Sequence, residues 1–112
     1  MHELSICQSI VDAVERHAAG RPVRAVHLTV GALRQIVPDT LTFCWELVTE
    51  ATPLAGSQLV VDHVAAVVRC LPCNRRQTLT EMNLVCDVCG GSDLSIVAGE
   101  EFLITTLELA EA

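Results

Sequence analysis

Aromatic residues are scarce in this chain of 112 residues. They make up 3% of it, whereas hydrophobic residues of all kinds make up 51%, and the only large rings are Trp45, Phe43 and Phe102. We therefore expect an aliphatic core of Leu, Ile, Val and Ala in which these are the only large rings. The length allows one ordinary domain, or a small domain that carries a smaller one.

Long apolar runs are also missing. The longest apolar stretch, residues 58–68, is interrupted by Asp62 and His63, and a membrane-spanning helix needs about 20 apolar residues. The opening Met-His-Glu-Leu lacks the basic region and apolar run of a secretory signal. These absences indicate a cytoplasmic protein with no membrane partner. In that compartment thiols stay reduced, which favours metal ligation by cysteine over disulfides.

Positive charge is in the minority as well. Seven basic residues face fourteen acidic ones, which gives a formal net charge of −7. Such a charge repels phosphate backbones, so nucleic acid is a poor default partner, although Arg69, Arg75 and Arg76 make one segment locally basic. No glycine-rich phosphate loop follows a predicted strand, so no known motif indicates nucleotide binding.

Cysteine is where the sequence is most informative. Cys70 and Cys73 form one Cys-x-x-Cys pair, Cys86 and Cys89 form a second, and twelve residues separate the pairs. Each pair can sit in a tight knuckle that aims two thiolates at one point, and two knuckles supply the four sulfurs of a closed structural zinc site. The gap is slightly short, which we interpret as a short hairpin between the knuckles. A redox disulfide is the alternative for either pair alone, but two pairs so close together favour a metal.

The spacing of apolar residues predicts two helices and three strands. Steps of three and four residues predict an amphipathic helix over 4–18, which Gly20 and Pro22 end. A second helix begins at Pro38-Asp39-Thr40 and ends near Thr52-Pro53. Period-two or Val-rich segments predict strands at 26–30, 58–69 and 101–109.

These elements predict an α+β fold, a small three-stranded sheet with two helices and an inserted zinc-ribbon lobe with four cysteine ligands. The strands at 58–69 and 101–109 flank the insertion, so we expect them to pair antiparallel. Residues 1–69 and 93–112 would form the larger α/β domain and residues 70–92 the zinc-binding domain. The latter is too short to bury a useful core and should depend on its metal for folding.

No convincing catalytic constellation is visible, and we predict a protein that is not an enzyme. Cys7 and Cys44 fall on the apolar faces of their helices, where a buried inert thiol is expected. His17 and His27 are interpreted as surface residues or as strand residues with satisfied hydrogen bonds, and His63 lies on a predicted strand where it could face either way.

His2 differs from the other histidines because of its position. Its imidazole lies within chelate reach of the α-amine of Met1, the intervening amide nitrogen and the amide of Glu3. Nickel(II) or copper(II) can displace amide protons and take such nitrogens in a square-planar arrangement, whereas zinc has little reason to do so. The alternative is an ordinary chain end in which His2 has no ligand role.

Three segments together resemble the HypA/HybF family of hydrogenase nickel-incorporation proteins. They are the opening Met-His-Glu-Leu-Ser-Ile, the start of the second helix (Pro-Asp-Thr-Leu-x-Phe, followed by Glu-Leu-Val-Thr-Glu), and the two cysteine pairs. Gly-Glu-Glu-Phe at residues 99–102 also fits the family pattern. The match covers essentially the whole chain, and the joint occurrence of the motifs is more specific than any one of them.

The resemblance implies a nickel metallochaperone. Nickel would be a transient cargo bound by Met1, His2 and Glu3, and a structural zinc ion would be held by Cys70, Cys73, Cys86 and Cys89. The implied partners are a HypB-family GTPase and the hydrogenase large subunit, and a homodimer is possible. This chain has no histidine after His63, so it lacks the extra histidine near the zinc lobe that some relatives use for nickel.

Two other functions compete with nickel delivery. The first is a zinc-ribbon protein that docks nucleic acid or a transcription assembly, supported by the cysteine spacing and the three arginines but opposed by the acidity. The second is an electron carrier with iron in the four-thiolate site, to which Cys89-Gly90 lends some support. Visible colour in the purified protein would favour the iron site, since zinc is colourless.

Overall fold

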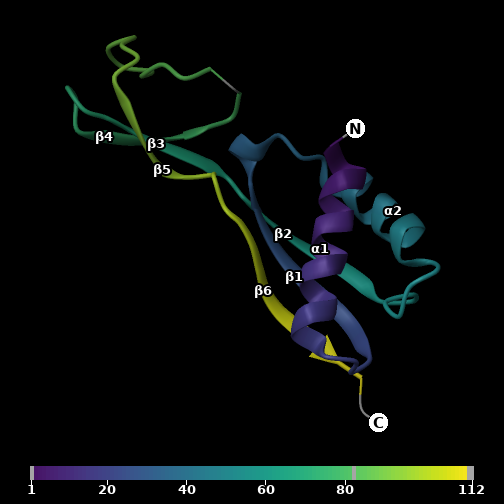
Figure 1. Cartoon of the computed structure of the whole chain (residues 1–112). Coiled ribbons are helices and arrows are strands. Elements are labelled where there is room, and N and C mark those ends of the chain that lie inside the picture. The colour runs from purple at the N-terminus through teal and green to yellow at the C-terminus, as the bar shows by residue number, and fades with distance from the viewer. Residues whose placement is uncertain (1, 82, 111–112) are drawn as a thin grey trace. The chain divides into compact units, whose positions relative to one another are not determined.

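The computed structural model describes residues 2–81 and 83–110, without the side chain of His2. Two α-helices, one 3-10 helix and six strands follow one another along the described chain (Figure 1). In order they are α1 (His2–Ala18), β1 (Val23–Gly31), η1 (Ala32–Arg34), α2 (Pro38–Thr49), β2 (Gln58–Val64), β3 (Ala66–Cys70), β4 (Arg75–Leu79), β5 (Leu94–Ala98) and β6 (Phe102–Leu109). None of the helices in the described residues is long and apolar enough to cross a membrane.

The chain divides into two compact units. The first unit takes its described residues from 2–29, 36–62 and 103–110, and the second, here called the cysteine unit, consists of Val30–Gln35 and His63–Phe102. The residues expected to form the zinc-binding domain, 70–92, fall inside the cysteine unit. The division at these residues into separately folding domains stays a prediction.

The first unit is built around α1 and the central strand β1. The predicted apolar stripe of α1 is buried, with Cys7, Ile10, Val14 and Ala18 between 0 and 4% exposed. The helix ends as predicted, because Ala19 and Gly20 have φ angles of 53° and 85° and glycine tolerates this left-handed conformation. The sheet order is β2-β1-β6, which leaves β1 in the middle (Figure 1).

The second predicted helix is also confirmed, as α2. Val37 precedes it in an extended conformation and Pro38 takes its first position, where the missing N–H costs nothing. Leu41, Trp45 and Thr49 are buried at steps of four residues, and the Trp45 Nε1–H donates to Ser57 Oγ at 3.1 Å.

The expectation that Phe43 contributes to the core is wrong. Its side chain is 62% exposed. At 3.6 residues per turn, a residue midway between Leu41 and Trp45 lies on the opposite side of the helix from both.

The predicted pairing of 58–69 with 101–109 is wrong for the first unit's sheet. There β1 lies between β2 and β6, so the two predicted partners occupy opposite edges. The segment 58–69 is also divided at Ala65 into β2 and β3. Only its second half leads to the cysteines, and it pairs with strands that the sequence pattern did not reveal.

The cysteine unit contains a second three-stranded sheet, with the order β4-β3-β5. Strand β4 pairs antiparallel with β3, which places Cys70 opposite Arg75. Strand β5 pairs antiparallel with the other edge of β3, which places Cys70 opposite Leu94. The expected hairpin therefore lies between β3 and β4, with the first cysteine pair in its turn, rather than between the knuckles.

Two glycines allow a close backbone approach in the cysteine unit. The Gly31 N–H donates to the Glu101 carbonyl at 2.7 Å, and the Leu33 N–H donates to the Gly99 carbonyl at 2.8 Å. A Cβ atom added to Gly31 would lie 2.0 Å from the Gly99 carbonyl oxygen. This contact therefore requires glycine at position 31.

Candidate metal centre

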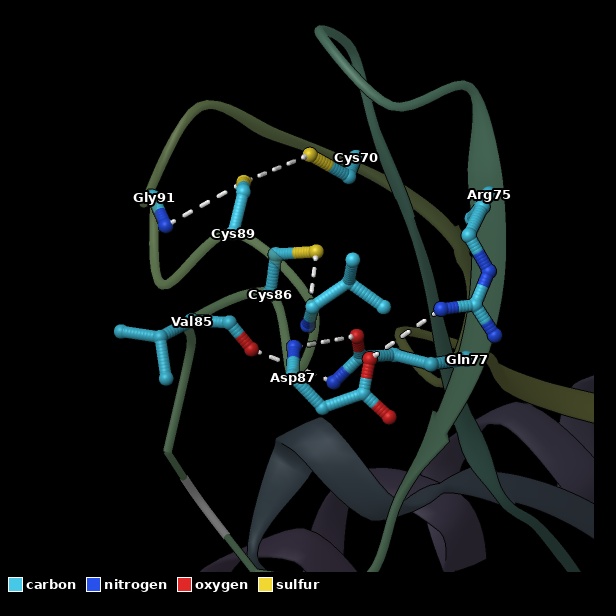
Figure 2. Close-up of polar contacts among 9 residues, drawn as sticks. Cys70, Arg75, Gln77, Val85, Cys86, Asp87, Cys89 and Gly91 are labelled. Carbon is cyan, nitrogen blue, oxygen red and sulfur yellow. Dashed lines mark hydrogen bonds and ion pairs between the residues drawn. The ribbon is translucent and has the colours of Figure 1, made fainter.

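The four cysteines of the two pairs converge on one point, as their spacing predicted. The Sγ atoms of Cys70, Cys73, Cys86 and Cys89 all lie within 4.8 Å of one another. Figure 2 shows Cys70, Cys86 and Cys89 turned toward a common centre, with 3.6 Å between the sulfurs of Cys70 and Cys89. The end of β3 and the loop before β5 supply one pair each. These four residues are called the four-cysteine cluster below.

Both cysteine pairs adopt the same local turn. The N–H of Asn74 donates to the Cys70 carbonyl at 2.7 Å, and the N–H of Gly90 donates to the Cys86 carbonyl at 2.8 Å. In each case the donor is the residue just after the second cysteine, and its φ angle is positive, 54° for Asn74 and 71° for Gly90. Asn and Gly are the residues that adopt this conformation most readily. The turn brings the two thiols of a pair to the same side.

Backbone N–H groups point at two of the sulfurs. The N–H of Val88 lies 3.4 Å from Cys86 Sγ, and that of Gly91 lies 3.4 Å from Cys89 Sγ. Such donors stabilise negative charge on sulfur. The site is therefore prepared to hold thiolates.

The side chain of Gln77 ties the second knuckle to β4. Its Nε2–H donates to the Val85 carbonyl at 3.1 Å, and its Oε1 accepts from the Asp87 N–H at 3.0 Å (Figure 2). Arg75 lies 3.7 Å from the Asp87 carboxylate. These contacts fix the loop that carries Cys86. The sequence pattern gives no sign of these contacts, because they depend on the long-range placement of β4.

The thiols differ in acidity. Hydrogen bonds from the backbone N–H groups of Cys89 and Val88 lower the pKa of Cys86 to about 7. Hydrogen bonding with the Cys89 and Cys70 thiols raises the pKa of Cys73 to about 12. The four sulfurs thus hold protons between them that a divalent cation would displace on binding.

The donor set fits zinc. With zinc–sulfur bonds of about 2.3 Å, a regular tetrahedron places its sulfurs about 3.8 Å apart, close to the 3.6 Å between Cys70 and Cys89. The convergence of all four sulfurs within 4.8 Å favours a shared metal over the redox-disulfide alternative, in which each pair would act alone. When bound, zinc would link the two knuckles and supply no open position for chemistry.

Of the predicted nickel ligands, the structure describes the backbone of His2 and the whole of Glu3, which lie in the first turn of α1. Met1 and the side chain of His2 lie outside the described residues. Glu3 is half-buried. A hydrogen bond from its own backbone is the main cause that lowers the pKa of its carboxyl; desolvation opposes this, and a hydrogen bond from the backbone of Val37 lowers the pKa further. The Glu3 carboxylate therefore already serves as an acceptor where α1 meets the segment before α2.

The three other histidines are not part of the four-cysteine cluster. His17 is exposed, with Nδ1 2.8 Å from the Ala13 carbonyl, and His63 is exposed on β2. His27 Nε2 lies 2.5 Å from Glu108 Oε2, and Arg24 donates to the other oxygen of that carboxylate at 3.1 Å. This trio joins β1 to β6. Sequence reasoning missed it because it did not expect these strands to be neighbours.

The two remaining cysteines are placed differently from each other. Burial raises the pKa of Cys7 to about 11, assisted by the nearby Cys44 and Glu3. Its S–H donates to the Leu41 carbonyl at 3.4 Å, so the expectation of a buried thiol is confirmed there. Cys44 is half-buried rather than fully buried.

Comparison with known proteins gives one consistent family. Residues 1–109 match the family described as "Hydrogenase/urease nickel incorporation, metallochaperone, hypA". The chain is 39% identical over 109 residues to the "Hydrogenase maturation factor HypA" of Geotalea uraniireducens (strain Rf4), covering 97% of this chain and 99% of the relative. It is 41% identical over 109 residues to the protein of that name from Geobacter sp. (strain M21), with the same coverage.

The fold is likewise similar to solved structures. The chain matches the "Solution structure of the Ni metallochaperone HypA from Helicobacter pylori" with a TM-score of 0.65 and 19% identity, covering 96% of each chain. A second solution structure, of a "HypA protein", matches with a TM-score of 0.61 and 22% identity, covering 98% of this chain and 97% of the other. At these identities the likeness supports the α+β fold with a four-cysteine lobe.

Proposed function

The chain belongs to the HypA family of hydrogenase/urease nickel-incorporation metallochaperones, and from this premise we propose that it binds nickel(II) at its N-terminus and delivers it to the large subunit of a [NiFe]-hydrogenase. The proteins it resembles are maturation factors rather than enzymes. The observation that carries the proposal is that the four-cysteine cluster has the geometry of a closed site. A closed site holds its metal firmly, so an exchangeable cargo needs other ligands.

The first turn of α1 offers those ligands. The first four N–H groups of an α-helix have no acceptor within the helix, and α1 begins at His2. The amide nitrogens of His2 and Glu3 therefore lie outside the helical hydrogen-bond ladder, and the Glu3 N–H donates to its own carboxylate. Together with the α-amine of Met1 and the imidazole of His2, they form the nitrogen-rich set that nickel(II) accepts. Glu3 contributes through its amide or its carboxylate.

The ligand types suit delivery rather than storage. An α-amine and an imidazole ordinarily titrate near neutrality, so protons compete with nickel for both. All ligands are close in sequence, so releasing the ion requires no rearrangement of the core. Nickel held in this way can pass to a partner that offers better ligands.

We propose the following partners and place of action. A GTPase of the HypB family cooperates in the transfer, the hydrogenase large subunit receives the ion, and a homodimer forms in some states. We further propose that the chain works in the cytoplasm. Zinc is proposed as a resident structural ion at the four-cysteine cluster.

The test is nickel titration of protein with an authentic N-terminus, by calorimetry with parallel metal analysis. Extending the chain by a few residues before Met1 should abolish specific binding, because a peptide bond turns the basic amine into an amide. His2→Ala should produce the same loss by removing the imidazole. Both changes precede most of α1, so zinc content and helical circular dichroism should not change.

A matched control removes an imidazole elsewhere. His63→Ala, at an exposed position of β2, should bind nickel as the unchanged protein does. Nickel binding by the extended protein equal to that of the authentic form would move the site away from Met1 and would contradict the proposal.

A further inference from the structure

The outer face of α2 carries two large apolar side chains in solvent. Phe43 is 62% exposed and Leu47 is 54% exposed. They are four residues apart, so they stand one turn above the other on the same face. This face lies opposite the buried stripe of Leu41, Trp45 and Thr49. We call Phe43 and Leu47 the α2 ridge.

Exposure of Phe43 is notable because the chain has few rings. Its tryptophan, Trp45, is 1% exposed, whereas Phe43, two residues earlier, faces solvent. Single exposed leucines are common on protein surfaces and need no explanation. Here an exposed aromatic ring lies one helical turn from an exposed leucine. Such a pair is typical of the anchor residues of an interface, since aromatic residues dominate the centres of protein interfaces.

One flank of the α2 ridge is negatively charged. Asp39, Glu46 and Glu50 are all exposed, and their spacing of seven and four residues places them along one side of the helix. No basic residue lies in the last turn of α2, and the sequence of the helix contains none. An apolar ridge bordered by carboxylates is complementary to an apolar stripe bordered by lysine or arginine.

We propose that the α2 ridge is the docking surface for a basic amphipathic helix of a partner protein in nickel transfer. Two of the motifs that carry the family resemblance, Pro-Asp-Thr-Leu-x-Phe and Glu-Leu-Val-Thr-Glu, form α2 and its C-terminal end. Leu41, Trp45 and Thr49 are the buried residues of α2, whereas Phe43, Leu47, Glu46 and Glu50 are exposed. The inference rests on the proposed function for the identity of the process, but the surface itself stands on exposure and charge.

Charge separates this occupant from the alternatives. A second copy would bring another net charge of −7, and its own α2 offers no cation to the three carboxylates. Nucleic acid and anionic membranes carry the same sign of charge as the flank and are repelled. A basic amphipathic helix is complementary to both: its apolar face can pack on the α2 ridge, and its cations can pair with the carboxylates of the flank.

The test is an NMR titration of the zinc-loaded full chain with a designed peptide of about 20 residues, long enough to form a helix on a surface. The probe carries leucines at helical spacing along one face and lysines on its flank. Amide shifts should change along residues 39–50, and the affinity should fall as salt is added. Phe43→Ala should weaken binding at least about tenfold, as expected for an interface anchor.

Two controls make the result specific. Leu103→Ala removes another apolar side chain, 57% exposed on β6, and should leave peptide affinity unchanged. A peptide with every lysine replaced by glutamate should bind at least about tenfold more weakly, because it meets carboxylates of its own sign.

Three outcomes would overturn the inference. They are shift changes away from α2, equal losses from Phe43→Ala and Leu103→Ala, or α2 shifts that depend on protein concentration without peptide, which would identify a second copy as the occupant. Nickel titration of Phe43→Ala separates this inference from the proposed function, since that variant should bind nickel normally. Failure of the N-terminal site would leave the peptide result unaffected.

Discussion

At the scale of single residues, the conformations of Asn74 and Gly90 determine how the thiols are aimed. Each residue follows a cysteine pair, has a positive φ angle and donates to the carbonyl of the first cysteine of its pair. A Cβ atom added at position 90 would meet no atom within 4 Å. The requirement for glycine there therefore comes from the backbone alone.

Gly90→Ala should weaken the zinc site by a small, definable amount. The left-handed conformation costs a residue with a Cβ atom about 1 kcal/mol, which corresponds to about a fivefold loss of zinc affinity when folding and binding are coupled. Competition with a chromophoric chelator measures it. Asn74→Gly is the matched control and should bind zinc at least as well as the parent. Unchanged affinity in Gly90→Ala would show that the turn relaxes without cost.

Glu108 should make the stability of the first unit depend on pH. Hydrogen bonds from His27 and Arg24 lower the pKa of this carboxyl below its ordinary value of 4.5. A carboxyl whose pKa is lower in the folded state stabilises the fold above the unfolded pKa, and the contribution disappears as pH falls through the folded pKa. Glu108→Gln should therefore lower the melting temperature at neutral pH.

The comparison across pH tests the sign of this effect. Melting temperatures of Glu108→Gln and of the parent should converge below about pH 4.5, where the carboxylate is lost in the unfolded chain first. Glu15→Gln, which removes an exposed carboxylate of α1, is the control for loss of one charge. A difference between Glu108→Gln and the parent that is the same at neutral and at acidic pH would exclude the His27–Glu108 interaction as its cause.

At the scale of elements, the knuckles and the sheet of the cysteine unit support each other. Strand β3 delivers Cys70, β4 carries Gln77 against the second knuckle, and β5 pairs with the other edge of β3. The sheet buries little: Ala66, Val68, Cys70 and Cys86 are the buried hydrophobic residues of the segment 63–102 among those the structure describes. A core this small needs a metal to keep its elements together.

Cys73→Ser should remove zinc and disorder the segment 70–92 while both helices persist. Three thiolates leave the ion without its fourth ligand, and the small core cannot compensate. Metal analysis and amide spectra measure the two effects, and circular dichroism measures the helices. Cys44→Ser, on α2, is the matched control and should retain zinc. Stoichiometric zinc in Cys73→Ser with unchanged spectra of 70–92 would refute the four-thiolate assignment.

The sequence predicted those elements whose signal is local. Periodic apolar residues indicated α1, α2, β1 and β6 to within a few residues, and the cysteine spacing indicated the metal cluster. Strand β4, with the sequence Arg-Arg-Gln-Thr-Leu, has no apolar alternation and forms because β3 pairs with it. The order β2-β1-β6 was missed for a related reason, since strand neighbours depend on contacts between distant segments.

At the scale of the whole molecule, two metals are assigned to ligands of different kinds. The four-cysteine cluster belongs to the cysteine unit, whereas the proposed nickel ligands lie at the start of α1 in the first unit. Soft thiolates retain zinc, and nitrogen ligands at a chain end release nickel as pH falls or a partner competes. Under the proposed function, this separation would let the chain exchange nickel while zinc stays at the four-cysteine cluster.

The long reach of the contacts made by β1 has a consequence for the order in which the protein is synthesised. His27 meets Glu108 across 81 residues of sequence, and Gly31 meets Glu101. On the ribosome, α1, β1 and β2 emerge long before β6 exists, so the nascent chain presents β1 with one edge unpaired. Translation must pass β6 before this sheet can close, and folding of the first unit is therefore a late event in the life of the nascent polypeptide.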